Sequence, residues 1–432
     1  MADVRLYPIL LGALLTGACD GERRAVSPEF PELASELPHD RDPQIDAAEA
    51  EALARQDHEL TFALYHALRE GEALGRGFAI SAYSIRSAFA MLLSGTVEPA
   101  RSELVATMNF SLAEPRQHVA LNWLAAQLES RNLPAEDQGR GEQAAVELHT
   151  ANGVWVLDDF AELISREYLD VLAVHYDAGV YLAQFDTRPE VERAAINAWV
   201  AERTAELIPE LFPFGSIDDM STLVLVNAVY LKAPWVEPFL EHNTRPAPFI
   251  RLDGSQVEVA MMHAADLQAA YGEGPGYRAV ALPLRGQALE VLMVVPDDFA
   301  GFEASLDASR FASLRADMSS AVIELGLPRF ELDAHLELTD ELQALGMIHP
   351  FVDDHSFDEI VEELGVITTV VHQTVIRVDE QGTEAAAATG VAIGVTSAVE
   401  PDVTIVVDRP FLLAIRDAPT DTLLFFGRVL EP

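Results

Sequence analysis

Apolar and polar positions follow two different periods along this chain, and the period changes near its middle. From residue 189 to residue 211, apolar side chains recur three or four positions apart, which predicts a helix with one apolar stripe. Residues 84–93 are apolar on nearly all sides and predict a helix buried within the fold. In the second half, residues 223–231 and 289–295 are β-rich runs bounded by turn residues, which predicts strands.

The C-terminal residues predict a closing pair of strands. Residues 403–415 and 422–429 have strand-like composition and flank a turn at residues 417–421. Because helices come first and strands later, the order favours a mixed α+β domain with a mostly helical first half over alternating βαβ units. The periodic patterns run from about residue 47 to residue 432 without another linker, and no repeat of solenoid period is visible.

The first 46 residues have a different character. After Arg5, an apolar run too short to span a bilayer ends in small residues before Cys19, which predicts a secretory signal peptide over residues 1–18. Residues 15–19 resemble a bacterial lipobox, although Thr16 stands where a large aliphatic residue is usual. We expect Cys19 to be lipidated, with plain secretion or an uncleaved anchor as alternatives.

Residues 19–46 are rich in Pro, Glu, Asp and Ser, and we interpret them as a flexible acidic tether behind the lipidated cysteine. The expected location is therefore outside the cytoplasm. The protein would be either secreted or a membrane-anchored lipoprotein of a bacterial cell envelope.

Composition excludes several classes of function. The 432 residues carry 28 Lys and Arg against 70 Asp and Glu, a formal net charge of −42, so a nucleic-acid partner is not expected. One cysteine allows neither an intrachain disulfide nor a thiolate metal site. No Gly-x-Ser-x-Gly elbow, His-Glu-x-x-His pair or phosphate loop is present. We expect neither an enzyme nor a cofactor.

One segment, residues 382–398, fits neither period. Its side chains are too small to build a core, and it is too long for an ordinary hairpin between the predicted strands on either side. One interpretation is a solvated loop. The other is an interior strand, because Thr383, Ala385, Ala387 and Thr389 would then point together, while Glu384 would face solvent.

Residues 380–389 closely resemble the reactive-loop hinge of inhibitory serpins, a family of serine protease inhibitors. Further motifs of that family recur in order over residues 47–432, at 78–84, 197–204, 225–235, 261–263, 408–411 and 425–429. The resemblance implies the serpin fold, with a large antiparallel-rich central β-sheet, smaller sheets and an exposed reactive-centre loop.

The resemblance also implies a function. The target serine protease would cleave the loop, about residues 380–397, and become trapped as a covalent acyl-enzyme when the loop inserts into the central sheet. We expect a monomer, and the acidic composition disfavours the heparin-type polyanion that some serpins bind. The alternative is a non-inhibitory serpin that acts as a protease substrate, a binding protein or a structural protein.

Family spacing places the reactive bond between Thr396 and Ser397, with Val395–Thr396 and Ser397–Ala398 as alternatives. All of these residues are uncharged, which favours an elastase-like or subtilisin-like target over a trypsin-like one.

Three groups of residues match family positions that control insertion. The hinge comprises Glu380, Gly382, Thr383, Glu384, Ala385, Ala386, Ala387, Ala388 and Thr389. The shutter, a hydrogen-bonded cluster that holds the central strands together, comprises Ser81, Ser84, Asn227 and His372. The breach, where insertion begins, comprises Lys232, Trp235 and Arg329, with Arg329 as the expected basic partner of Glu380.

Overall fold

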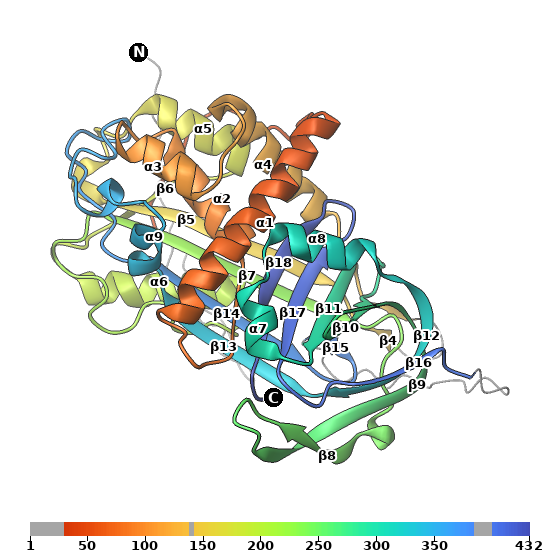
Figure 1. The fold of residues 1–432 in the computed structure, drawn as a ribbon. Helices are drawn as coiled ribbons and strands as arrows, with labels where there is room; N and C mark the ends of the chain where they lie inside the picture. The colour runs from red at the N-terminus through yellow and green to blue at the C-terminus, as the bar shows by residue number, and fades with distance from the viewer. Residues whose placement is uncertain (1–29, 138–141, 384–399) are drawn as a thin grey trace, which may run out of the picture.

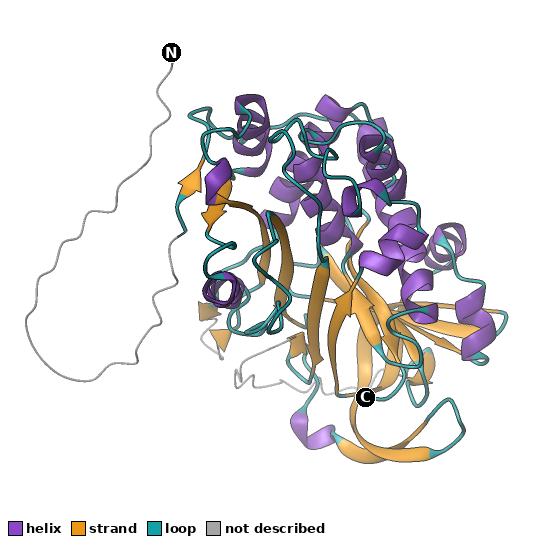
Figure 2. Ribbon diagram, turned by 90° about the vertical axis from the view of Figure 1, so that its left-hand side faces the viewer, coloured by secondary structure: helices purple, strands orange, loops and turns teal. Residues whose placement is uncertain are grey.

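The computed structural model describes residues 30–137, 142–383 and 400–432, and two large sheets organise them (Figure 1). The helices gather mainly on one side of the strands (Figure 2). Their bounds are α1 Ala47–Glu70, α2 Ala82–Leu93, α3 Ala100–Thr107, α4 Glu114–Glu129, α5 Arg166–Tyr176, α6 Pro189–Arg203, α7 Phe299–Ala304, α8 Ala308–Ala316 and α9 Thr339–Ala344.

Among the described residues, the central sheet has seven strands in the order β1-β6-β5-β7-β15-β14-β13. In that order they are Glu32–Leu33, Val180–Ala183, Glu147–Leu157, Leu223–Pro234, Gly382–Thr383, Val371–Val378 and Phe330–Glu337.

The second sheet has nine strands in the order β16-β12-β9-β10-β11-β17-β18-β2, with β8 paired to β9. They are β16 Val403–Val406, β12 Ser319–Pro328, β9 Gln256–Gly274, β10 Tyr277–Pro283, β11 Leu289–Pro296, β17 Phe411–Asp417, β18 Thr422–Val429, β2 Phe78–Ile80 and β8 Arg245–Ile250. A small pair, β3 Glu136–Asp137 and β4 Glu142–Gln143, stands apart.

Local sequence explains where the main helices begin and end. Helix α1 starts at a capping box, in which Asp46 and Glu49 each satisfy the other's backbone N–H. Helix α2 is buried along its whole length, in agreement with its all-round apolar pattern. Helix α6 ends at Arg203, short of the predicted residue 211, because Ala205 and Glu206 have left-handed φ angles of 49° and 63°.

The C-terminal prediction is wrong in one respect. Residues 403–415 do not form one strand, because Pro410 cannot donate to a ladder and separates β16 from β17. Strand β16 runs parallel to β12 in register Ile323↔Val403, whereas β17 and β18 form the expected antiparallel pair.

Residues 30–46 differ from the flexible tether that the sequence predicts. Strand β1 pairs with β6 at the edge of the central sheet, and Leu33 is buried there. The ring of Phe30 meets the ring of Trp155 edge-on at 5.7 Å. The proline spacing that forbids a helix is compatible with an edge strand, where Pro31 needs no N–H partner. Residues 1–29, including Cys19 and the predicted signal peptide, lie outside the described residues.

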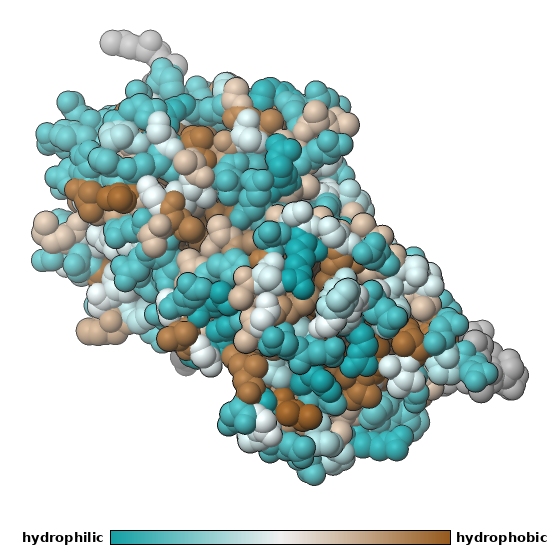
Figure 3. Space-filling view, in the orientation of Figure 1, coloured by the Kyte–Doolittle hydropathy of each residue, from teal (hydrophilic) through white to brown (hydrophobic). Residues whose placement is uncertain are grey.

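Two apolar clusters form the core. The larger fills the space between the sheets and the helices, and the smaller lies between α6 and the central sheet, where Trp155 and Trp199 contact edge-on at 4.9 Å. The face shown in Figure 3 is mostly hydrophilic, with scattered hydrophobic residues. Within the described residues, no helix is long and apolar enough to cross a membrane.

Candidate functional site

In the central sheet, β7 and β14 are direct partners over part of their length and have the short strand β15 between them at one end (strands labelled in Figure 1). These two strands run parallel, and along their length they pair directly at Ala228 and Gln373. Toward one end, the short strand β15 lies between them and is antiparallel to both. The first two residues of the segment that fits neither sequence period therefore already occupy a strand position in the sheet. Residues 384–399, and with them the rest of the predicted hinge and the reactive bond, lie outside the described residues.

Strand β15 packs so closely against its neighbours that its residues must be small. A Cβ atom on Gly382 would stand 2.2 Å from the carbonyl oxygen of Ala233, so only glycine fits against β7. The Thr383 side chain is 2% exposed, and its hydroxyl lies 3.2 Å from both the backbone nitrogen and the backbone oxygen of Ala233. Thr383 thus faces the interior, on the side that strand alternation assigns to it.

The Glu380 carboxylate is held next to the start of β15. Arg329 donates to Glu380 Oε1 from Nη2 at 2.6 Å and from Nε at 2.8 Å, and the Thr244 hydroxyl donates to the same oxygen. Burial opposes ionisation of Glu380, but the hydrogen bonds from Arg329 and Thr244 prevail and lower its pKa. The structure therefore brings together Glu380 and its expected partner.

The two remaining breach residues lie in different surroundings. Trp235 is 2% exposed, and its indole Nε1 donates to the carbonyl of Asp379 at 2.9 Å. Lys232 lies on the β5 side of β7, where its ammonium stands 3.8 Å from the Glu147 carboxylate. The structure thus places Trp235 against the turn that precedes β15 and directs Lys232 toward β5.

The four predicted shutter residues meet at the start of α2. The Ser81 backbone N–H donates to His372 Nε2 at 3.0 Å, and the Asn227 side-chain amide donates to the Ser84 hydroxyl at 2.5 Å. Ser81 also caps α2 by accepting the N–H of Ser84. Helix α2 therefore anchors β7 through Asn227 and β14 through His372. Burial lowers the pKa of His372 to about 3, so its ring is neutral and Nε2 can accept.

Sequence reasoning missed three polar residues of this region. Asn152 on β5 accepts a 2.7 Å hydrogen bond from Asn227, and Thr374 on β14 donates to the Ala79 carbonyl at 2.7 Å. The third is Thr244, beside Glu380. Thr374 lies two positions after His372 and so on the same face of the strand, a signal that the sequence does contain. Neither Asn152 nor Thr244 carries such a signal.

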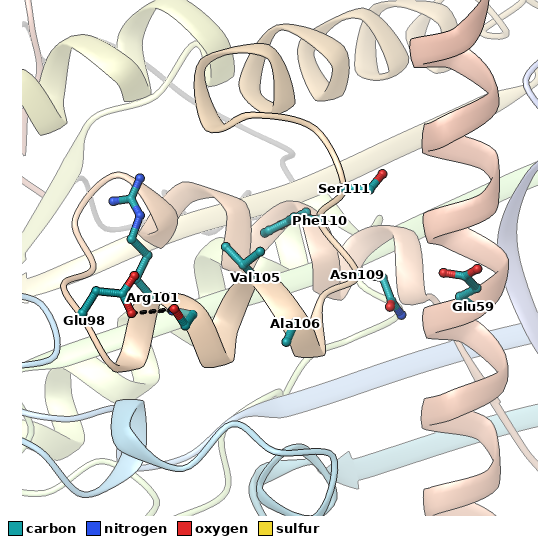
Figure 4. Close-up of a pocket in the computed structure, with 9 residues that line it drawn as sticks. Glu59, Glu98, Arg101, Val105, Ala106, Asn109, Phe110 and Ser111 are labelled. Carbon is teal, nitrogen blue, oxygen red and sulfur yellow. Dashed lines mark hydrogen bonds between the residues drawn. The ribbon is translucent and has the colours of Figure 1, made fainter.

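Two surface cavities accompany this arrangement. A cavity of about 440 Å³ between α1 and α3 is lined by charged and polar residues such as Glu59, Glu98 and Arg101, and none of the predicted site residues lines it (Figure 4). A smaller one of about 200 Å³ lies beside Trp235. Within the part of the chain that the structure describes, no group of three or more His, Cys, Asp or Glu is placed to hold a metal ion.

Comparisons with known proteins agree with this geometry. A serine protease inhibitor from Cyanea capillata is 31% identical over 361 residues, which cover 82% of this chain and 91% of the relative. Antithrombin-III from Mus musculus is 29% identical over 360 residues, with coverages of 82% and 76%. The solved native structure of tengpin, a thermophilic serpin, matches with a TM-score of 0.77 at 22% identity, over 92% of this chain and 97% of that one. This match confirms the predicted fold.

A family model described as "Serpin (serine protease inhibitor)" matches residues 55–432. Together with the curated relatives, this match shows that the chain belongs to the serpin family of serine protease inhibitors.

Proposed function

We propose that this serpin inhibits its target as a suicide substrate, by inserting its cleaved reactive loop between β7 and β14. The observation that carries the proposal is strand β15. Thr383 already pairs with both neighbouring strands and Gly382 with β7, so the hinge has a defined starting point inside the sheet.

Cleavage would begin the reaction. The nucleophilic oxygen of the protease bonds to the carbonyl carbon of Thr396, the peptide bond to Ser397 breaks, and the Ser397 amine leaves with a proton. The protease is then joined to the hinge side of the loop by an ester. A water molecule would normally hydrolyse this ester and release both proteins.

Insertion competes with that hydrolysis. Residues 382–396 as one strand would span roughly 50 Å at about 3.3 Å per residue, which carries the bound protease far from where it docked. The strain of that displacement takes the protease's catalytic triad and oxyanion hole out of register, so deacylation stops.

Continuation of the β15 register supports this step. Thr383 faces the interior, so alternation would also turn inward the predicted hinge residues of the same parity, namely Ala385, Ala387 and Thr389. All of them are small and uncharged, and an incoming strand with such side chains can enter a packed sheet without displacing its core. A charged or bulky residue at one of these positions would oppose entry.

The uncharged residues around the reactive bond favour an elastase-like or subtilisin-like target, since a trypsin-like pocket presents a carboxylate to the substrate. The expected product is a one-to-one covalent complex between a monomeric inhibitor and its protease. The same residues allow cleavage in a non-inhibitory serpin, so complex formation is the discriminating outcome.

The experiment incubates the full chain with an elastase-like, a subtilisin-like and a trypsin-like protease and resolves the products by denaturing gel and mass spectrometry. We expect a covalent band with one of the first two and a released C-terminal peptide that begins at Ser397. A protease whose active-site serine is blocked serves as the control and should give no such band. Cleavage without a stable complex would sink the proposal and favour the non-inhibitory alternative.

We also propose that residues 1–18 are removed and that Cys19 carries a lipid that holds the inhibitor outside the cytoplasm. Support comes from the basic start, the short apolar run and the lipobox-like residues before Cys19. Mass spectrometry of the protein purified from bacterial membranes should find an acylated N-terminal peptide, and Cys19→Ser should leave it unacylated. An intact residue 1 in the membrane fraction would contradict this location mechanism.

A further inference from the structure

The chain reverses direction within three residues between β14 and β15. The N–H of Asp379 donates to the carbonyl of Gly382 at 3.1 Å, which closes the turn. The Asp379 carboxylate accepts the N–H of Gln381 at 2.7 Å and the N–H of Gly382 at 3.3 Å. One side chain therefore satisfies two backbone donors that the tight turn would otherwise leave without partners.

The short segment that directly follows β7 donates hydrogen bonds to the carbonyl groups of this turn. Trp235 donates from its indole to the carbonyl of Asp379 at 2.9 Å and from its backbone to the carbonyl of Gln381 at 2.8 Å. Phe239 donates its N–H to the carbonyl of Glu380 at 2.9 Å. All three carbonyl groups of the turn thus accept hydrogen bonds from this segment, while the Asp379 carboxylate accepts the two backbone N–H groups of the turn.

The turn sets the register of everything that follows. Its last residue, Gly382, packs against the β7 backbone too closely for any side chain, which places Thr383 opposite Ala233 on one strand and Val378 on the other. A slip by one residue would exchange the two faces of the incoming strand and direct the Glu384 carboxylate into the sheet.

We propose that Asp379 is the positioning residue of loop insertion, because its carboxylate folds the hinge into the one register that keeps Glu384 in solvent. This inference rests on the proposed insertion mechanism and extends it to a residue outside the predicted hinge. Asp379 acts through the backbone of residues 381 and 382 and does not touch the protease.

The surroundings of Asp379 indicate which property of the side chain matters. It is half-buried, and burial raises its pKa, so this environment does not favour a negative charge. Both N–H groups converge on Asp379 Oδ1, so we expect the position of this acceptor oxygen to be the important property. Asparagine presents an oxygen at the same position without the charge, whereas glutamate keeps the charge and moves the oxygen by one methylene.

The test compares Asp379→Asn, Asp379→Glu and Asp379→Ala in the full chain. The matched control is Asp253→Ala, which removes a similar turn contact to the Ser255 N–H in the β8–β9 hairpin. The first readout is hydrogen–deuterium exchange of the free protein over residues 380–383. Asp379→Ala and Asp379→Glu should speed exchange at residues 381 and 382 by about tenfold, whereas the Asn variant and the control should leave it unchanged.

The second readout is the number of inhibitor molecules consumed per trapped protease. A loosened hinge inserts more slowly, so a larger share of the acyl-enzyme is hydrolysed before insertion. We therefore expect this number to rise about fivefold for the Ala and Glu variants and to stay near the wild-type value for the Asn variant. The rate of initial association should change less than about twofold in every variant, because residues 383–395 separate the turn from the predicted reactive bond in the sequence.

Three outcomes separate the possibilities. An Asn variant that behaves like Ala, together with a Glu variant that behaves like wild type, would overturn the positional role in favour of charge. If the Asp379→Ala variant shows the exchange rates and the inhibition stoichiometry of the wild type, Asp379 has no role in positioning the hinge. If the wild-type chain forms no covalent complex, the proposed function fails, and the exchange experiment alone still decides whether Asp379 sets the turn.

Discussion

At Thr383, the inward orientation that sequence alternation predicts can be compared directly with the structure. Its hydroxyl contacts the β7 backbone at Ala233, and its side chain is closed off from solvent. A charge at this position would have to be buried without a partner, which is strongly unfavourable in a protein interior. Glu384 has the opposite parity, so the proposed insertion would leave its charge in solvent.

We therefore predict that Thr383→Arg converts the inhibitor into a substrate. The guanidinium stops β15 from forming, the acyl-enzyme is hydrolysed, and the covalent complex is lost while the cleavage rate is retained. The measurement is the ratio of complex to cleaved inhibitor on a denaturing gel. Glu384→Arg is the control and should keep the complex; equal complex formation by both variants would contradict insertion with this parity.

Buried histidines are single residues that make the stability of the folded chain depend on pH. Burial lowers the pKa of His372 to about 3 and that of His118 to about 4, and the His118 ring stacks on His175 between α4 and α5 at 5.7 Å. An unfolded histidine has a pKa of about 6.5. Between these values the unfolded chain binds protons that the folded chain does not, so acid favours unfolding.

We predict that the denaturant midpoint is constant above about pH 6.5 and falls as the pH is lowered toward 4. His118→Phe keeps a ring at the position and removes one titrating group, so its midpoint should fall less over the same range. Midpoints from tryptophan fluorescence at pH 7, 6, 5 and 4 test this. A variant whose midpoint falls as steeply as that of the wild type would exclude His118 as a source of the pH dependence.

At the scale of elements, period and turn chemistry predicted several of the helices and strands, but not all of their ends. Helix α2 and strands β7 and β11 lie where the pattern places them. Helix α6 stops eight residues early, because left-handed residues follow it, and that conformation has no reliable sequence signal outside glycine and asparagine. Strand β1 was missed, because two paired residues are too few for an alternating pattern to be visible.

Strand β1 yields a prediction of its own. Leu33 is 7% exposed, whereas Leu37 in the same segment is 48% exposed. Leu33→Ala should lower the thermal midpoint by about 2–4 °C, as expected for a buried leucine lost from a large domain. Leu37→Ala is the control and should leave the midpoint unchanged, as measured by differential scanning calorimetry. Equal midpoints for the two variants would show that residues 30–46 do not stabilise the fold.

At the scale of the whole molecule, the proposed mechanism requires that the native form is a kinetic trap and not the most stable arrangement of the chain. Beyond β15, β7 and β14 pair directly at Ala228 and Gln373, so the proposed mechanism requires these strands to part and admit an additional strand. Filling that position adds a ladder of hydrogen bonds on both sides and buries more apolar surface.

We predict that cleavage within residues 390–396 raises the thermal midpoint of the wild-type protein well above that of the intact form. Thr383→Arg, cleaved in the same way, should show no such rise, because its hinge cannot enter. Thermal unfolding followed by circular dichroism before and after cleavage measures the difference. A cleaved wild-type protein no more stable than the intact form would contradict the trapped native state.

The sequence alone determined the α+β class, the small residues at alternate hinge positions and the acidic character of the molecule, because each depends on local period, spacing or composition. Its motifs also carried the resemblance to the family. Only the tertiary structure decided that Thr244 joins Arg329 at the Glu380 carboxylate, that Lys232 pairs with Glu147, and that the Asp379 carboxylate accepts the N–H of Gln381. Most of these contacts join residues far apart in the chain, and sheet register and topology decide which side chains meet across such distances. The Asp379 contact is local, yet its role follows from the strands on either side of the turn.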